Sequence, residues 1–211
     1  MKVRHVLWDL DGTLLDTYPA TDGALAAALS GLGHETTAAA LRPLTRITLD
    51  HAILQTAASS GLPLDAVYAA YEREYAVLGQ QFSPAMPGAR AALQAVRDRG
   101  GLNLLATHRD REGASARLKA AGLYALLDDL RSVSDGYARK PSPELFVALL
   151  EQYRLNPAEV LVVGDRDLDI RAGRAAGCLT ALLVTEGAPM DTGADWVLGG
   201  LEELVTLSGS E

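Results

Sequence analysis

Residues 3–16 read VRHVLWDLDGTLLD, and this stretch shapes the expectation for the whole chain. Its first part, Val3–Trp8, is a short apolar run with β-branched residues, and Gly12, a residue typical of turns, follows soon after it. These features predict a buried first strand. Asp9 and Asp11 come directly after the run, and since side chains two apart on an extended chain point the same way, both carboxylates are expected on one side.

Two carboxylates so close together repel each other, and they are tolerated only when a cation neutralises them or one of them holds a proton. The pair Asp9 and Asp11 therefore suits a hard metal ion combined with acid–base chemistry. Gly12 and Thr13 follow the pair and free the backbone to bend around an anion. Taken alone, the same Asp-Gly pattern is equally consistent with an ordinary turn or a helix cap.

The second half of the chain alternates between extended and helical patterns. Apolar strand candidates lie at 102–107, near Leu130, and at 160–165, 180–184 and 196–198. Helical patterns lie between them at 89–99, 111–122, 143–153 and 169–177, and a last short helix ends the chain. Uniformly apolar strands that alternate with helices indicate a parallel sheet covered on both faces.

The segment after the first strand has a different composition and hydrophobic pattern. From Thr21 to Gln81 it is rich in Ala and Leu at helical spacing, with breaks near Gly33, Pro43 and Gly61. We therefore predict an α/β fold with a doubly wound parallel-sheet (Rossmann-like) core. The predicted core consists of residues 1–15 and 88–211, and residues 16–87 form an all-helical insertion.

Polar residues gather where the predicted strands end, which is the edge at which open α/β sheets bind ligands. The groups found there are a hydroxyl, an ammonium and further carboxylates, contributed by Thr107, Lys140, Asp165, Asp167 and Asp169. Together with the first two carboxylates they provide a nucleophile, a proton shuttle, ligands for a divalent ion, and groups that hold phosphoryl oxygens. This set predicts phosphoryl transfer.

Four motifs in chain order carry a family resemblance. DLDGTLLD, the threonine of LLATHRD, the lysine of RKPSPE, and GDRDLD closely resemble the motifs of the haloacid dehalogenase-like hydrolase superfamily. The resemblance implies that Asp9 attacks the phosphorus, while Asp11 protonates the leaving oxygen and then activates water. It also implies a Mg²⁺ ion bound by the carboxylates of Asp9 and Asp165 and the backbone carbonyl of Asp11. Asp169 would support that metal through water or orient Lys140.

The same resemblance assigns binding roles. Thr107 and Lys140 would hold the oxygens that are not transferred, and Gly12 and Thr13 are candidate contacts with the substrate. The helical insertion resembles the cap domain of the phosphoglycolate phosphatase-like branch, which closes over the site on hinges expected near 16–19 and 84–88. Alone, Thr107 is more typical of a helix N-cap and Lys140 of a solvated surface residue.

Four further side chains are candidate substrate contacts. His108 and Arg109 follow Thr107, although such flanking residues usually face solvent. Arg42 and Arg46 lie in the insertion and could reach a second anionic group of the substrate, such as a carboxylate. An arginine on a helix surface is more often solvated.

Several other activities must be weighed against a phosphatase. Dehalogenases of this superfamily lack the second carboxylate, which is present here as Asp11. Phosphonate-cleaving members need a lysine in the cap. The lysines of this chain are Lys2, Lys119 and Lys140, and none of them lies in the insertion, which excludes that activity. β-Phosphoglucomutase-type phosphotransferases share all four motifs and stay open as the alternative. A non-catalytic regulator that binds phosphate or metal would have no use for the second carboxylate.

The composition excludes several classes of binding partner. With 19 Lys and Arg against 27 Asp and Glu, the formal charge is −8, so we expect no binding to nucleic acid. No apolar stretch is long enough to span a bilayer, and Asp9 and Asp11 interrupt the N-terminal run, so neither a membrane nor export is expected. The single cysteine, Cys178, allows no internal disulfide. We expect a cytoplasmic monomer or homodimer that acts on a small phosphorylated metabolite.

Overall fold

The computed structural model describes residues 3–78, 83–185 and 192–207, and the chain divides into two units. Met1–Leu15 and Ala85–Glu211 form the first unit, and Asp16–Pro84 form the second. Where the chain leaves and re-enters the first unit, Leu15 forms an antiparallel bridge with Ala85, and the Met86 amide donates to the Leu14 carbonyl over 2.9 Å. The second unit is therefore inserted between two backbone segments that are hydrogen-bonded to each other.

The first unit is built on a six-stranded sheet with the strand order β3-β2-β1-β4-β5-β6, and every neighbouring pair in it is parallel. The strands are β1 (His5–Trp8), β2 (Asn103–Thr107), β3 (Asp129–Ser132), β4 (Val160–Gly164), β5 (Leu179–Leu183) and β6 (Trp196–Leu198). The predicted doubly wound parallel sheet is confirmed. The first strand begins two residues later than the apolar run suggested.

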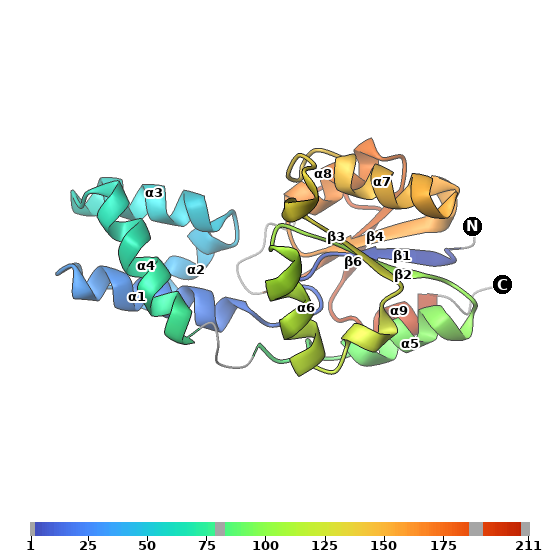
Figure 1. The fold of residues 1–211 in the computed structure, drawn as a ribbon, viewed down its shortest axis with the longest axis horizontal. Coiled ribbons are helices and arrows are strands. Elements are labelled where there is room, and N and C mark those ends of the chain that lie inside the picture. Colours follow the sequence, from blue (N-terminus) through green and yellow to red (C-terminus); the bar gives the residue numbers. More distant parts are fainter. Residues whose placement is uncertain (1–2, 79–82, 186–191, 208–211) are drawn as a thin grey trace. The chain divides into compact units, whose positions relative to one another are not determined.

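Helices cover both faces of this sheet (Figure 1). One face carries α7 (Glu144–Tyr153) and α8 (Asp167–Ala175). The other face carries α5 (Ala89–Asp98), α6 (Arg111–Ala120) and α9 (Glu203–Leu207). Among the described residues of this unit, three short 3₁₀ helices lie in the connections, namely η1 (Tyr124–Leu126), η2 (Val133–Asp135) and η3 (Pro157–Glu159).

The alternation of side chains along β1 explains why the strand is apolar on both sides. Val6 and Trp8 belong to the apolar core under α5, α6 and α9, whereas Leu7 belongs to the core under α7 and α8. All three side chains are fully buried. The indole Nε1 of Trp8 donates to Oδ1 of Asn103 over 2.9 Å, so the one polar atom of this side chain is satisfied.

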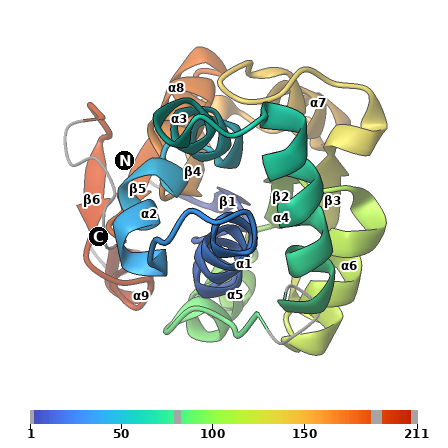
Figure 2. The same ribbon diagram turned by 90° about the vertical axis from the view of Figure 1, so that its left-hand side faces the viewer.

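The second unit consists, among the described residues, of α1 (Tyr18–Gly31), α2 (Ala38–Thr45), α3 (Leu49–Ser60) and α4 (Leu64–Leu78). Helix α1 packs against α2 and α4, and α3 also packs against both (Figure 2). The unit has its own apolar core, which includes Leu25, Leu29, Ile53 and Val67. The helical region predicted from the sequence extended to Gln81, but residues 79–82 lie outside the described residues.

Two threonines define where helices of the second unit begin. The Thr37 side chain accepts a hydrogen bond from the Ala40 amide at the start of α2, and the Thr48 side chain accepts one from the His51 amide at the start of α3. Across the described residues of both units, none of the helices is long and apolar enough to cross a bilayer.

Candidate active site

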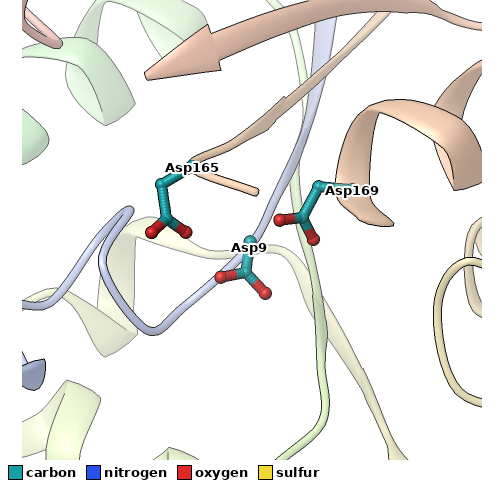
Figure 3. A group of neighbouring side chains, drawn as sticks. All are labelled: Asp9, Asp165 and Asp169. Carbon is teal, nitrogen blue, oxygen red and sulfur yellow. The ribbon is translucent and has the colours of Figure 1, made fainter. Parts of the chain in front are cut away.

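Three buried carboxylates meet at the carboxyl edge of the sheet (Figure 3). Asp9 follows β1, Asp165 follows β4, and Asp169 lies in the first turn of α8. Each offers an oxygen that lies within 4.8 Å of those of the other two. They converge because β1 and β4 are neighbours in register, and the Asp9 amide donates to the carbonyl of Val163 over 2.9 Å.

Gly164 allows Asp169 to reach this cluster. A Cβ atom at residue 164 would lie 2.3 Å from the Cβ of Asp169 and 2.7 Å from its Oδ2. The helix α8 can therefore begin directly beyond the end of β4 only because residue 164 has no side chain. The Arg166 amide donates to Asp169 Oδ2 over 3.2 Å, which fixes the carboxylate at the start of the helix.

Lys140 places an ammonium group among these carboxylates. Its Nζ lies 2.5 Å from Oδ1 of Asp9 and 2.5 Å from Oδ1 of Asp169, and it donates to the carbonyl of Ala106 over 3.1 Å. The side chain is fully buried. Burial alone would lower the pKa of Lys140, but the carboxylates of Asp169 and Asp9 outweigh burial and raise it. Lys140 therefore carries its charge in the folded protein.

The cluster retains an excess of negative charge. Three carboxylates face one ammonium group, which leaves these four buried groups with two uncompensated negative charges when all are ionised. Asp9 Oδ2 is buried and has no hydrogen-bonding partner among the described residues. Burial raises the pKa of Asp9, Lys140 opposes this rise, and Asp169 adds to it. A carboxylate oxygen of Asp9 without a partner among the described residues and an excess of two negative charges fit a hard divalent cation.

Asp11 is not part of the three-carboxylate cluster and is partly exposed. Its Oδ1 accepts a hydrogen bond from Arg109 Nε over 2.8 Å, and Arg109 Nη2 lies at 2.8 Å from the same oxygen. Gly12 has a φ of 82°, a left-handed conformation that favours glycine, and its amide donates to the Leu15 carbonyl. The turn returns the chain so that Thr13 Oγ1 donates to Asp165 Oδ1 over 3.4 Å.

Thr107 ends β2, next to β1, and is fully buried. Its Oγ1 accepts a hydrogen bond from the Arg109 amide over 3.1 Å. The N-cap of the following helix α6 is Asp110, whose side chain accepts from the Gly113 amide. The helix-cap alternative for Thr107 is therefore wrong, although its hydroxyl does organise the turn after β2.

His108 lies within this turn, between Thr107 and Arg109, and contacts the segment that carries Lys140. Its Nε2 accepts a hydrogen bond from the Lys140 backbone amide over 2.8 Å. Burial, together with the positive charge of Lys140, lowers the pKa of His108 to about 3. His108 is therefore neutral at physiological pH.

Arg42 and Arg46 belong to the second unit, where both surround Asp22. Arg46 Nη2 lies 3.5 Å and Arg42 Nε 3.6 Å from Asp22 Oδ2, while Thr45 Oγ1 donates to Asp22 Oδ1 over 2.6 Å. The guanidinium of Arg46 also stacks on the ring of Tyr18 at 3.3 Å and is almost completely buried. A substrate role for these arginines stays a prediction, but Arg46 is not the solvated surface residue of the alternative interpretation.

The sequence interpretation missed Asp22. The available signal was its spacing, because Asp22 lies four residues after Tyr18 and three before Leu25, which places it on the apolar face of α1. A carboxylate on an apolar helix face needs a cation nearby.

A doubly wound sheet that gathers carboxylates, a buried ammonium and a hydroxyl-bearing turn at its carboxyl edge is suited to phosphoryl transfer. The family model for haloacid dehalogenase-like hydrolases matches residues 3–177, and the chain belongs to that family. Its relatives place it in the phosphoglycolate phosphatase-like branch, so the protein is a phosphatase of this family.

Two curated relatives and one solved structure illustrate the similarity. The chain is 32% identical to a phosphoglycolate phosphatase of Cupriavidus necator, over 96% of this chain and 91% of the relative. It is also 32% identical to hexitol phosphatase A of Escherichia coli, over 97% of this chain and 94% of the relative. The structure of a HAD family hydrolase from Deinococcus radiodurans superposes with a TM-score of 0.81 at 24% identity, covering 95% of this chain and 93% of that one.

Proposed function

We propose that this protein is a Mg²⁺-dependent phosphatase that hydrolyses a small phosphomonoester, such as phosphoglycolate or a sugar phosphate, through an aspartyl-phosphate intermediate. The observation that carries the proposal is the environment of Asp9. One of its oxygens is paired with Lys140, and the other is buried without a partner among the described residues. The names of the relatives, which include phosphoglycolate and hexitol phosphatases, support the substrate class.

In the first half of the proposed reaction, a carboxylate oxygen of Asp9 attacks phosphorus. The bond between phosphorus and the leaving oxygen breaks, and Asp11 gives its proton to that oxygen. Asp11 is the suitable proton donor because it lies two residues from Asp9 and outside the buried three-carboxylate cluster. The products of this step are an alcohol and a phosphorylated Asp9.

In the second half, water attacks the phosphorus of the aspartyl-phosphate. Asp11, now ionised, takes the proton of that water, and the bond between phosphorus and the Asp9 oxygen breaks. Inorganic phosphate leaves, and both carboxyl groups return to their starting states. One acid–base residue thus serves both steps.

The residues present fit the metal that the family resemblance implies. Asp9 and Asp165 would hold Mg²⁺ with their carboxylates and Asp11 with its backbone carbonyl. When bound, Mg²⁺ supplies charge neutralisation for the phosphoryl oxygens. Both oxygens of Asp169 already accept hydrogen bonds, from Lys140 Nζ and from the Arg166 amide, which supports orientation of Lys140 as the role of Asp169.

Other groups would bind the remaining phosphoryl oxygens in this proposal. Lys140 contributes a fixed positive charge and Thr107 a hydroxyl. Gly12 and Thr13 stay candidate contacts, although their backbone amides already donate to the carbonyls of Leu15 and Leu10. The helical unit would act as the cap that selects the leaving group, with Arg42 and Arg46 as its candidate contacts to a second anionic group. We place the enzyme in the cytoplasm, as a monomer or homodimer.

Steady-state hydrolysis of a panel of phosphomonoesters, with and without Mg²⁺, tests this function. The panel contains phosphoglycolate, hexitol phosphates, nucleoside monophosphates and β-glucose 1-phosphate, and phosphate release is measured. Mg²⁺-dependent release from one or more esters is the expected result. Isomerisation of β-glucose 1-phosphate without net phosphate release would instead identify a mutase, and no turnover of any ester would identify a binding protein.

A further inference from the structure

The backbone amide and the side-chain ammonium of Lys140 both contact the segment at the end of β2. Its side-chain Nζ donates to the carbonyl of Ala106 over 3.1 Å. Its backbone amide donates to the imidazole Nε2 of His108 over 2.8 Å. Ala106 and His108 are separated only by Thr107, so one short segment contacts both the charged group of Lys140 and the backbone that carries it.

The second of these contacts defines the chemical state of His108. A backbone amide can only donate, so Nε2 must carry no proton, and the neutral ring holds its proton on Nδ1. The lowered pKa of His108 agrees with this state. The imidazole therefore acts as an acceptor in this contact, and a residue without an acceptor at the same reach could not replace it.

The segment around Lys140 needs such an anchor. It lies in neither a helix nor a strand, between η2 and the start of α7, and a turn in which the Ser142 amide donates to the Arg139 carbonyl is its local structure. A lysine side chain has several rotatable bonds. The position of its ammonium group is therefore well defined only when the backbone of the residue is fixed.

We propose that His108 is a positioning residue that fixes the backbone of Lys140 and thereby keeps its ammonium between Asp9 and Asp169. This catalytic consequence rests on the proposed function. His108 acts through Lys140 and does not bind the substrate itself, which distinguishes this role from the substrate contact expected from the sequence.

Three variants separate these roles. His108→Gln keeps an acceptor oxygen at nearly the reach of Nε2, His108→Leu has similar bulk without an acceptor, and His108→Asn has the same amide one methylene shorter. Hydrolysis of p-nitrophenyl phosphate with Mg²⁺ gives kcat and KM, and circular dichroism with thermal unfolding establishes that each variant folds. His108→Asn takes the place of His108→Leu should the latter not fold.

We expect His108→Leu and His108→Asn to lower kcat about 10- to 100-fold, because a small displacement of a catalytic group has effects of that size. KM should stay within about threefold, and His108→Gln should recover most of kcat. Unchanged kcat in both His108→Leu and His108→Asn would overturn the proposal. So would a raised KM at unchanged kcat, which indicates a substrate contact, or equal losses in His108→Gln and His108→Leu.

Exchange of the Lys140 backbone amide with deuterium, followed by NMR, provides a readout that needs no activity. The amide should exchange faster in His108→Leu and His108→Asn than in the wild type, and protection should return in His108→Gln. Equal protection in all four proteins would overturn the positioning role. A wild type that hydrolyses no ester would refute the proposed phosphatase mechanism, while the exchange rates would still decide whether His108 fixes this backbone.

Discussion

The guanidinium of Arg109 forms an ion pair with a single oxygen of Asp11, and its Nε and Nη2 atoms both lie 2.8 Å from Oδ1. Each of the two side chains is about one-fifth exposed. Arg109 follows β2 and Asp11 follows β1, so the pair joins the ends of two neighbouring strands. The pairing fixes the orientation of the Asp11 carboxylate, for which we propose an acid–base role, at the carboxyl edge of the sheet.

The role of Asp11 predicts a dependence on the leaving group. Asp11→Asn should lower turnover of an alkyl phosphate such as phosphoglycolate about 100- to 10,000-fold, because general acid–base catalysis contributes factors of that size. p-Nitrophenolate needs no proton to leave, so the variant should release a burst of it before hydrolysis of the intermediate becomes limiting. Rapid-mixing absorbance measures the burst. Equal losses on both substrates without a burst would remove Asp11 from this role.

Asp9→Asn should abolish turnover and leave the fold intact. The nucleophile is lost, yet Lys140 keeps Asp169 as a partner at 2.5 Å, so no buried charge is stranded. Phosphate release and thermal unfolding measure the two effects, and mass spectrometry excludes deamidation back to Asp. Full turnover of a confirmed Asn variant would refute the assignment of the nucleophile.

Lys140→Met should destabilise the fold, unlike Asp9→Asn. Removal of the ammonium leaves the carboxylates of Asp9 and Asp169 buried beside each other, and loss of one partner from a buried ion pair costs about 3–5 kcal/mol of the free energy of unfolding. Chemical denaturation without metal measures this loss, with Asp9→Asn as the matched control. Added Mg²⁺ should recover part of the loss, because a bound cation stabilises the native state. Equal stability of the two variants would contradict this account of the cluster.

Gly164→Ala tests the close approach of β4 and α8. The added methyl group would overlap the Asp169 side chain, so we expect a loss of about 1–3 kcal/mol in stability, as for other overpacked sites. Turnover should fall as well, because Asp169 orients Lys140. The control is Gly31→Ala in α1, where a Cβ would meet nothing within 4 Å. Thermal unfolding and phosphate release should separate the two variants, and identical behaviour would show that the contact is easily relieved.

The neutrality of His108 predicts a pH dependence. With a pKa of about 3 in the folded protein, caused first by burial and then by Lys140, the imidazole should stay uncharged from pH 5 to 8. The unfolded chain binds this proton below about pH 6.5. His108 therefore contributes stability above that pH, and the contribution is lost as pH falls toward 3. Two-dimensional ¹H–¹⁵N NMR of the ring reports its protonation state, and titration near pH 6 would exclude the role of His108 as an acceptor.

The sequence was sufficient to predict that the polar residues after the strands converge at one edge of the sheet. Asp9 and Asp165 each follow an apolar run, and parallel strands bring such positions to one edge of the sheet. The position of Lys140 could be expected only from its motif, because the segment around it has no regular structure.

The partners of the remaining charged residues could not be predicted in the same way. Arg109 pairs with a residue 98 positions away, and Arg46 with one 24 positions away. No local pattern fixes such pairs, because side-chain partners depend on how distant elements pack. The weak extended pattern near Leu130 has a physical reason too, since β3 is an edge strand and alternates between buried and half-buried residues.

The antiparallel bridge between Leu15 and Ala85 has an evolutionary consequence. The two ends of the sheet-bearing chain already meet there, so recombination could exchange everything between them without disturbing a strand of the sheet. Because we propose that the helical unit selects the leaving group, such an exchange would give a lineage new substrates while the catalytic residues stay the same.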